Sequence, residues 1–178
     1  MNIASFDVEE HHRIEGAAGS AIGPELKAEY GTRMEAATHR IVDQLAAANA
    51  KATFYIVGEI ARSHPRLVRD IADAGHEIGS HSWDHRMVNR FNPAEFRKDL
   101  LKSKSALEDA SGQRVVGFRA DVQHRHRTPW AVDALVECGF EYDSSIFPVR
   151  HDRYGIPDAP RDPFQAKGES HAFSNCRR

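Results

Sequence analysis

Apolar and polar residues follow one another along this chain in short apolar runs and longer stretches of helical period. The runs rich in β-branched and aromatic residues predict strands at 3–7, 52–57, 77–80, 115–118 and 140–142. Stretches with apolar residues three and four positions apart predict helices at 32–48, 64–75, 92–112 and 128–139. Five strand units joined by helical crossovers indicate an α/β fold, either a parallel sheet or an α/β barrel.

The clearest local signal is the start of the third predicted helix. Asn92 can cap it, Pro93 suits the first helical position, and Glu95 completes a capping box. Gly139 stands where the last predicted helix ends, and glycine suits such a position because it readily adopts a left-handed conformation.

Candidate chemistry follows the first and third predicted strands. His81 and His85 stand four residues apart, and Asp7 and Glu9 stand two apart. Because residues i and i+2 of a strand face the same side, both carboxylates can point at whatever the histidines hold. Two imidazoles and one carboxylate suit a catalytic zinc with an open position, and a second carboxylate suits a general base. Each pair alone has a simpler interpretation, but together they favour a metal site.

These motifs resemble those of the polysaccharide deacetylases of the NodB-homology type, carbohydrate esterase family 4. The branch associated with exopolysaccharide and exosortase gene clusters is the most similar. The matching segments are 5–9, 52–58, 76–85, 117–120, 143–148 and 154–157. The resemblance implies a (β/α)7-type barrel that is incomplete and C-terminally truncated here. It predicts a deacetylase domain at 1–168 and an aberrant tail at 169–178.

The same resemblance implies roles for single residues. Asp7 corresponds to the catalytic base, and His81 and His85 correspond to metal ligands. The commonest family pattern has a second aspartate where this chain has Val8, whereas the similar branch has Asp-Val-Glu. We therefore predict that Glu9 is the third ligand; the alternative is that Glu9 points to water and only the histidines bind.

Three further residues bear on the predicted mechanism. Arg119 matches the family arginine that orients the catalytic aspartate, and a guanidinium can clamp a carboxylate with two hydrogen bonds. A structural ion pair is the alternative. Trp83 is predicted to be either the wall of a sugar pocket or a core side chain. His171 does not lie in a matching motif, so the acid that protonates the leaving amine is not assigned.

The resemblance implies a hydrolase that removes N-acetyl groups from amino sugars of a polysaccharide or its precursor. Its cofactor is expected to be a divalent metal, and the ligand set favours zinc, although cobalt or another divalent ion also fits. An amidohydrolase that cleaves a small C–N substrate is one alternative. A non-catalytic, truncated remnant is another.

The remnant hypothesis depends on two breaks in the family pattern. Residues 121–126 are charged and histidine-rich where the family has a pocket wall, and a pair of compensating frameshifts could restore the family text. From about Glu169 the chain leaves the pattern again. If both breaks are real, we expect marginal folding, an exposed strand edge and little activity.

Composition narrows the range of partners. The chain has 178 residues and a net charge of −2, which suits one globular domain and argues against a nucleic-acid partner. No apolar run approaches the roughly 20 residues of a membrane span, and the N-terminus lacks a leader pattern, so we expect a cytoplasmic protein. Its two cysteines, Cys138 and Cys176, do not make a disulfide framework. A carbohydrate is the expected partner, and the oligomeric state is not predicted.

Overall fold

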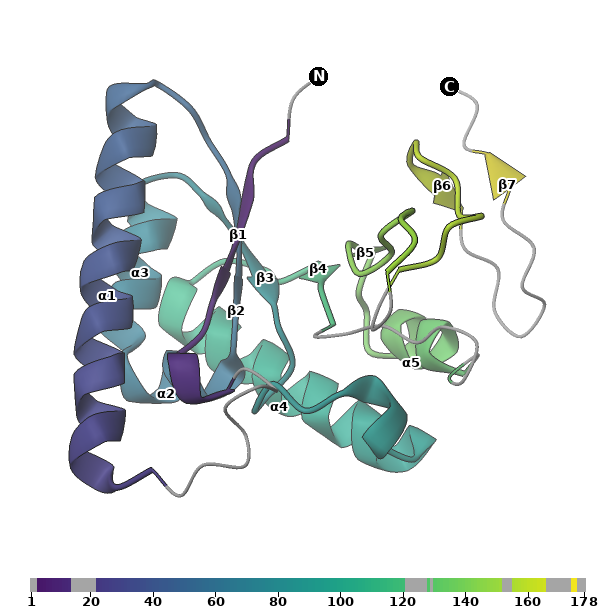
Figure 1. Ribbon diagram of the computed structural model, residues 1–178, viewed down its shortest axis with the longest axis horizontal. Coiled ribbons are helices and arrows are strands. Elements are labelled where there is room, and N and C mark those ends of the chain that lie inside the picture. The colour runs from purple at the N-terminus through teal and green to yellow at the C-terminus, as the bar shows by residue number, and fades with distance from the viewer. Residues whose placement is uncertain are drawn as a thin grey trace.

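The computed structural model describes residues 3–13, 22–120, 128, 130–151, 155–165 and 174–175. Its centre is a parallel sheet of five strands in the order β1-β2-β3-β4-β5 (Figure 1). The strands are β1 (Ser5–Val8), β2 (Thr53–Ile56), β3 (Glu77–Ser80), β4 (Gly117–Phe118) and β5 (Tyr142–Asp143). Spatial order follows chain order because each parallel strand needs a crossover before the next. The predicted α/β fold is confirmed.

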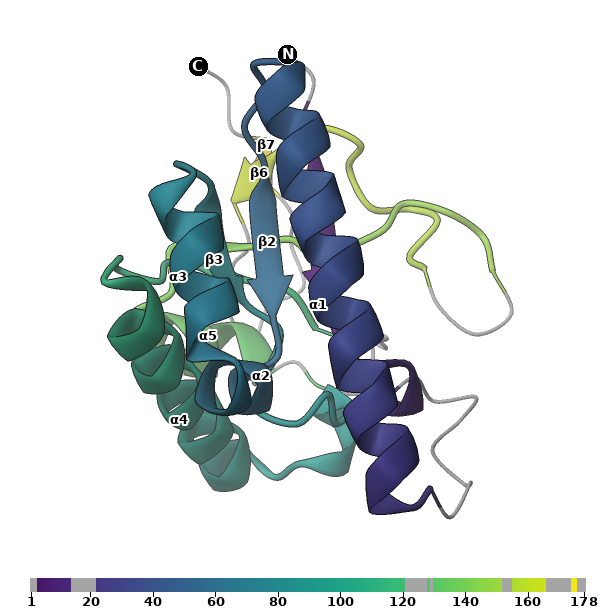
Figure 2. The same cartoon turned by 90° about the vertical axis from the view of Figure 1, so that its left-hand side faces the viewer.

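Helices cover one side of this sheet, as Figures 1 and 2 show together. They are α1 (Pro24–Ala47), α2 (Gly58–Ser63), α3 (Pro65–Asp73) and α4 (Pro93–Ser111). Two short 3-10 turns, η1 (His11–Arg13) and η3 (Val88–Arg90), and the helix α5 (Ala131–Glu137) complete the helical elements. A separate antiparallel pair, β6 (Phe164–Gln165) and β7 (Ser174–Asn175), lies apart from the main sheet (Figure 1). In the part of the chain that the structure describes, no helix is long and apolar enough to span a bilayer.

The apolar core lies between the sheet and these helices. Its largest fully buried side chains come from β2, β3, β4, α2, α3 and α4 and include Phe54, Ile56, Ile60, Leu67, Ile71, Ile78, Phe96, Leu100, Leu107 and Phe118. All four residues of β2 are buried, as expected for a parallel strand that is covered on both faces. Cys138 is also buried.

Helix α4 confirms the predicted capping box. The Asn92 side chain accepts a hydrogen bond from the Glu95 N–H at 2.9 Å, and the Glu95 carboxylate accepts one from the Asn92 N–H at 3.0 Å. The helix ends at Gly112, whose φ of 71° lies in the left-handed region. Well-defined ends suit this helix as a support, because it packs against α2, α3, α5 and β3.

The largest boundary error concerns α1, which begins at Pro24 rather than at residue 32. The prediction followed the apolar stripe of Ile41, Val42 and Leu45, but the first turns of this helix are mostly exposed and carry no such stripe. Proline at the first helical position was the available signal. The six-residue helix α2 and the β6–β7 pair were not predicted, because elements this short show no periodicity.

The carboxyl ends of the strands lie side by side at one edge of the sheet. The register pairs Val8 with Ile56, Ile56 with Ser80, Ser80 with Phe118 and Phe118 with Asp143. The ladder continues for one residue more: the His81 N–H donates to the Ile56 carbonyl at 3.0 Å, and the Arg119 N–H donates to the Ser80 carbonyl at 2.9 Å. This register brings Glu9, His81 and Arg119 to the same edge.

Candidate metal centre

Glu9, His81 and His85 converge at this edge. Each offers one ligand atom, and these atoms lie within 4.8 Å of one another. Nε2 of His85 is 2.7 Å from a carboxylate oxygen of Glu9 and 3.1 Å from Nε2 of His81. The structure therefore brings together the three residues predicted to bind metal, although Glu9 lies just beyond the end of β1.

Both imidazoles are oriented by backbone carbonyls. Nδ1 of His81 donates to the Arg119 carbonyl at 2.7 Å, and Nδ1 of His85 donates to the Arg13 carbonyl at 3.1 Å. Since a carbonyl can only accept, each Nδ1 carries its hydrogen, and each Nε2 is left to face the centre. Metal-binding histidines are commonly fixed in this way by a partner on the other ring nitrogen.

The donor set fits a divalent cation. Two imidazole nitrogens and a carboxylate oxygen facing one another are donors of the kind that bind a divalent cation such as zinc. Burial raises the pKa of Glu9, but the hydrogen bond with His85 and nearby positive charge outweigh it and hold that pKa below its ordinary value. Burial lowers the pKa of His81. A charged carboxylate and a neutral imidazole are the forms that bind metal.

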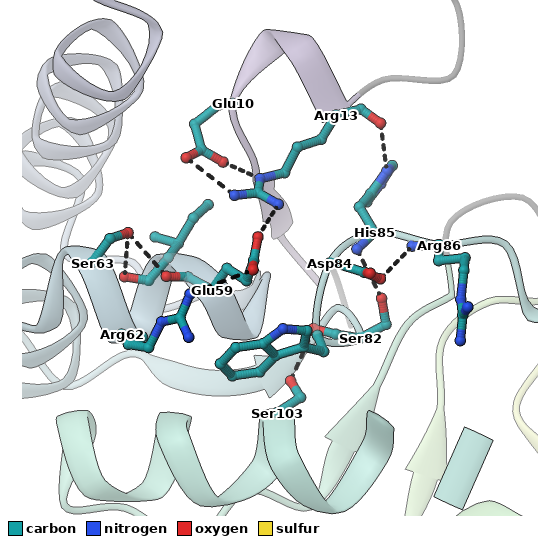
Figure 3. Close-up of polar contacts among 12 residues, drawn as sticks. Glu10, Arg13, Glu59, Arg62, Ser63, Ser82, Asp84, His85, Arg86 and Ser103 are labelled. Carbon is teal, nitrogen blue, oxygen red and sulfur yellow. Dashed lines mark hydrogen bonds and ion pairs between the residues drawn. The ribbon is translucent and has the colours of Figure 1, made fainter. Parts of the chain in front are cut away.

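The loop between the two histidines has a strained backbone. Ser82 and His85 have φ values of 60° and 64°, in the left-handed region that residues other than glycine rarely adopt. The Ser82 hydroxyl accepts the His85 N–H at 3.1 Å (Figure 3). Strain of this kind persists only where the surroundings hold it. Here it turns His85 back toward His81.

Buried contacts from α2 and α4 hold this loop in place. The Ser82 carbonyl accepts hydrogen bonds from the Gly58 N–H and from the Ser103 hydroxyl, both at 2.9 Å (Figure 3 shows the latter). Asp99 of α4 accepts the Trp83 N–H at 3.0 Å. Burial raises the pKa of Asp99 to about 7, although the Trp83 N–H opposes this shift. A Cβ on Gly58 would lie 2.8 Å from the Trp83 ring, so only glycine permits this approach of α2.

Trp83 is a buried side chain beneath the loop. Its ring lies between two cations, with the Arg62 guanidinium 5.1 Å and the Lys102 ammonium 3.7 Å from the ring centroid. It does not line the cleft described below. Of the two interpretations that the sequence left open for Trp83, the structure favours packing.

Arg119 binds the side chain of Asp7, the predicted catalytic base, which lies in β1. It donates to the Asp7 carboxylate at 2.7 Å and, through its other terminal nitrogen, to the Ser5 and Ser144 hydroxyls at 2.8 Å each. The contact with Asp7 uses one N–H, not the two that the sequence predicted, because the remaining donors bind elsewhere. The guanidinium also lies 4.1 Å above the Tyr55 ring. Held on a ring and by three partners, it has little freedom to move.

The Tyr55 ring can lie beneath the Arg119 guanidinium because the neighbouring residue of β3 is Gly79. A Cβ on Gly79 would be 2.5 Å from the Tyr55 ring, a distance that real Cβ atoms do not show. Gly79 thus determines the height of the ring, and the ring in turn supports Arg119.

A cleft of about 880 Å³ opens beside His85. It lies between η1, α1, α2 and the loop that follows the second histidine. Many of the side chains around it are charged, among them Glu10, Arg13, Lys27, Glu59, Arg62 and Arg86. The cleft reaches the candidate centre at His85, whereas Glu9, His81 and Asp7 are not among the residues that line it.

The five site residues predicted from the sequence all lie at this edge of the sheet. Sequence reasoning missed three residues next to them: Glu10, Arg13 and Glu59. Arg13 contributes a backbone carbonyl, which has no sequence signal. No sequence pattern distinguishes the two acids from the other glutamates of the chain. The segment 121–126 and His171 lie outside the described residues, as does most of the tail from 169.

Residues 26–142 match the family model for polysaccharide deacetylases. This chain belongs to the polysaccharide deacetylase family. The match includes His81, His85 and Arg119 and begins after Asp7 and Glu9. The family predicted from the motifs is confirmed, whereas the roles of the single residues stay predictions.

Known relatives resemble a part of this chain. A peptidoglycan-N-acetylglucosamine deacetylase of Bacillus cereus is 34% identical over 104 residues, which are 56% of this chain and 38% of that protein. A protein of Mycobacterium smegmatis described as a polysaccharide deacetylase is 29% identical, with a TM-score of 0.65 over 82% of this chain and 50% of that one. A family 4 pseudoenzyme from Bacillus anthracis, solved as a mutant with restored activity, is 26% identical, with a TM-score of 0.57 over 61% and 39%. The chain thus spans half or less of the length of these relatives.

Proposed function

We propose that this polysaccharide deacetylase family member is a metal-dependent hydrolase that removes N-acetyl groups from amino sugars of a polysaccharide or its precursor. The observation that carries the proposal is the meeting of Glu9, His81 and His85 beside an Asp7 that is held by Arg119. A three-residue ligand set with a separate carboxylate nearby is the arrangement that metal-assisted hydrolysis of an amide requires.

Each residue has a distinct task in this proposal. Glu9, His81 and His85 would hold the cation, and zinc is the metal that their donor set favours. Bound there, the cation would lower the pKa of water and polarise the acetamide carbonyl. Asp7 would accept a proton from the attacking water as general base. Arg119 would keep Asp7 aimed, because its other donors are bound to Ser5 and Ser144 and hold the guanidinium in place.

The substrate class rests on the relatives and on the cleft. The Bacillus cereus relative is named for the N-acetylglucosamine of peptidoglycan. The cleft beside His85 is open and lined by polar and charged side chains, which suits a hydrated glycan better than an apolar ligand. We therefore propose an N-acetylated amino-sugar polymer as the substrate, and we expect an oligomer of N-acetylglucosamine to serve as a test substrate.

Acetate release provides the test. The purified chain would be loaded with one equivalent of Zn²⁺ or Co²⁺ and incubated with an N-acetylglucosamine oligomer, and acetate would be quantified by an enzyme-coupled assay. The proposal predicts metal-dependent acetate release that the Asp7→Asn variant lacks. Metal retention after desalting, measured by mass spectrometry, checks the centre independently of turnover.

The two alternatives predict other outcomes of the same test. Cleavage of a ureide without acetate release from the sugar would favour an amidohydrolase acting on a small C–N substrate. One equivalent of bound metal without turnover on either substrate would favour a non-catalytic chain. The pseudoenzyme among the structural relatives gives the second alternative a precedent on this fold.

A further inference from the structure

The two imidazoles of the candidate centre depend on carbonyls from different kinds of structure. The carbonyl that orients His81 belongs to Arg119, whose own N–H continues the sheet ladder at 2.9 Å from the Ser80 carbonyl. The carbonyl that orients His85 belongs to Arg13, the last residue of the three-residue turn η1. Among the described residues, one backbone bond closes this turn, from the Arg13 N–H to the Glu10 carbonyl at 2.9 Å. It needs additional support to hold a carbonyl in place.

That support comes from the Arg13 side chain, which lies between two carboxylates (Figure 3). One terminal nitrogen donates to Glu59 at 2.7 Å, and Nε and the other terminal nitrogen contact the Glu10 carboxylate. The Arg13 and Glu10 side chains are only 13% and 8% exposed. A guanidinium that is held on two sides and largely covered cannot change rotamer without leaving carboxylates unpaired. The backbone of Arg13 is fixed as a result.

Glu59 connects this turn to the histidine loop itself. Its carboxylate binds Arg13, while its backbone N–H donates to the Trp83 carbonyl at 2.9 Å. Trp83 lies midway between the two histidines in the sequence. One residue of α2 therefore holds both partners of the His85–Arg13 hydrogen bond: the loop that presents the imidazole and the turn that presents the carbonyl.

We infer that Glu10, Arg13 and Glu59 form a positioning trio that fixes the orientation and tautomer of His85 and so sets the metal affinity of the centre. The inference rests on the proposed metal site and adds to it three residues that do not touch the metal. The trio selects the ring with hydrogen on Nδ1, which leaves the Nε2 lone pair for the cation. Outer partners of this kind typically change metal affinity about 10–100-fold when they are mutated.

Four variants test the trio. Arg13→Met removes the guanidinium but keeps an unbranched side chain. Because it leaves two carboxylates without their partner, a triple variant with Glu10→Gln, Arg13→Met and Glu59→Gln removes all three charges together. Arg13→Lys keeps the charge without the planar fork, so it should retain part of the Zn²⁺ affinity that Arg13→Met loses. Arg114→Met is the matched control, because Arg114 forms an equally short ion pair with Glu141 at 2.8 Å on the exposed surface.

Two measurements are made on each variant. The Zn²⁺ dissociation constant is obtained by competition with a chromophoric chelator. Long-range ¹H–¹⁵N NMR of the metal-free protein reports which ring nitrogen of each histidine carries hydrogen. We expect the Arg13→Met and triple variants to bind Zn²⁺ about 10–100-fold more weakly. The Nδ1–H form of His85 should be lost in them while that of His81 stays, and Arg114→Met should behave as the wild type.

The two histidines make the result decisive. General loosening of the fold would affect both imidazoles, whereas loss of the trio should affect only His85. A triple variant that folds as the wild type by circular dichroism, binds Zn²⁺ with unchanged affinity and keeps the His85 Nδ1–H would overturn the inference. So would equal disturbance of both rings. Neither measurement involves a sugar, so a wild type that binds metal but releases no acetate would overturn the proposed function alone.

Discussion

The two histidines of the candidate centre stand four residues apart, yet different parts of the fold hold them. His81 is nearly enclosed by the sheet: its N–H continues the β2–β3 ladder, and its ring donates to a carbonyl directly after β4. His85 has a left-handed backbone, and its ring donates to a carbonyl of the turn η1, 72 residues away in the sequence. One histidine directly extends the main sheet, and the other is held by a turn outside it.

This difference indicates how substitutions can change the metal affinity of the site while the central sheet stays the same. The sheet position of His81 depends on register, which no single surface substitution alters. The position of His85 depends on Ser82, on the trio of Glu10, Arg13 and Glu59, and on contacts from α4. We therefore expect substitutions near His85 to tune metal affinity gradually, whereas substitutions near His81 should disturb the sheet edge and the Asp7–Arg119 pair as well.

The largest effect on turnover is expected from a substitution of Asp7, which lies on the His81 side of the comparison. Asp7→Asn removes the proposed base but keeps a side chain that can accept the Arg119 N–H. Loss of a general base typically lowers turnover about 10²–10⁴-fold, and Asp7 is not among the three proposed metal ligands, so Zn²⁺ affinity should stay near the wild-type value. Acetate release and chelator competition measure the two quantities separately. Asp43→Asn, at an exposed position of α1, serves as the control; a parallel loss of metal would show that Asp7 is itself a ligand.

The next effect concerns Glu9, for which the sequence left two interpretations open. If Glu9 is the third ligand, Glu9→Gln should weaken Zn²⁺ binding by more than the 100-fold that bounds outer-partner effects, because a neutral amide replaces a charged ligand. If it points to water, binding should not change. The 2.7 Å contact with His85 favours the first result. Glu25→Gln, on the exposed first turn of α1, is the control for the loss of one surface charge.

A smaller effect on the His81 side should follow from Gly79→Ala. The added Cβ would lie 2.5 Å from the Tyr55 ring, so the ring and the Arg119 guanidinium above it must move. Overpacking of this kind costs about 1–3 kcal/mol, and we expect acetate release to fall about 10-fold or more as Asp7 loses its orientation. Urea unfolding measures the loss of stability, and the acetate assay measures the loss of turnover. Gly23→Ala is the control, because a Cβ there meets nothing within 4 Å.

Most of the sheet side could be predicted from the sequence. The strand β3 was predicted with its observed bounds because a short strand-like segment around Ile78 follows a helix-ending glycine. His81, Arg119 and Asp7 follow strands, and parallel strands end at one edge, so their meeting followed from the pattern. The capping box at Asn92 was equally readable, since its residue types have few other reasons to occur in that order.

The His85 side could be predicted only in part. The histidine itself belonged to a motif, but its partner is a backbone carbonyl, and any residue type can supply one. Glu10 and Glu59 are important because both contact Arg13. Glu59 stands 46 residues from Arg13 in the sequence, so no local pattern marks this shared contact. The short helix α2, which carries Glu59, was itself not predicted. Site geometry that depends on turns and short helices therefore becomes visible only in the folded structure.

The smallest expected effect concerns Asp99, which supports the loop between His81 and His85. It is a change in how the stability of the protein depends on pH. Its pKa is about 7 in the folded protein against an ordinary value of 3.8, because burial disfavours the charged form. Between these values the folded state holds a proton that the unfolded state has lost, so stability is present at low pH and declines as the pH rises through 7. Asp99→Asn removes this dependence and keeps an oxygen that can accept the Trp83 N–H.

We therefore expect the stability advantage of Asp99→Asn over the wild type in urea to be about 2 kcal/mol larger at pH 8 than at pH 5. The full linkage value would be larger, but hydration of a carboxyl near the surface reduces it. Metal-free protein is used so that ligand protonation acts equally on both chains. Asp109→Asn, at an exposed position of the same helix, is the control. An equal difference between wild type and variant at both pH values would show that Asp99 is already ionised in the folded state, and that the loop joining the two histidines rests on a charged support.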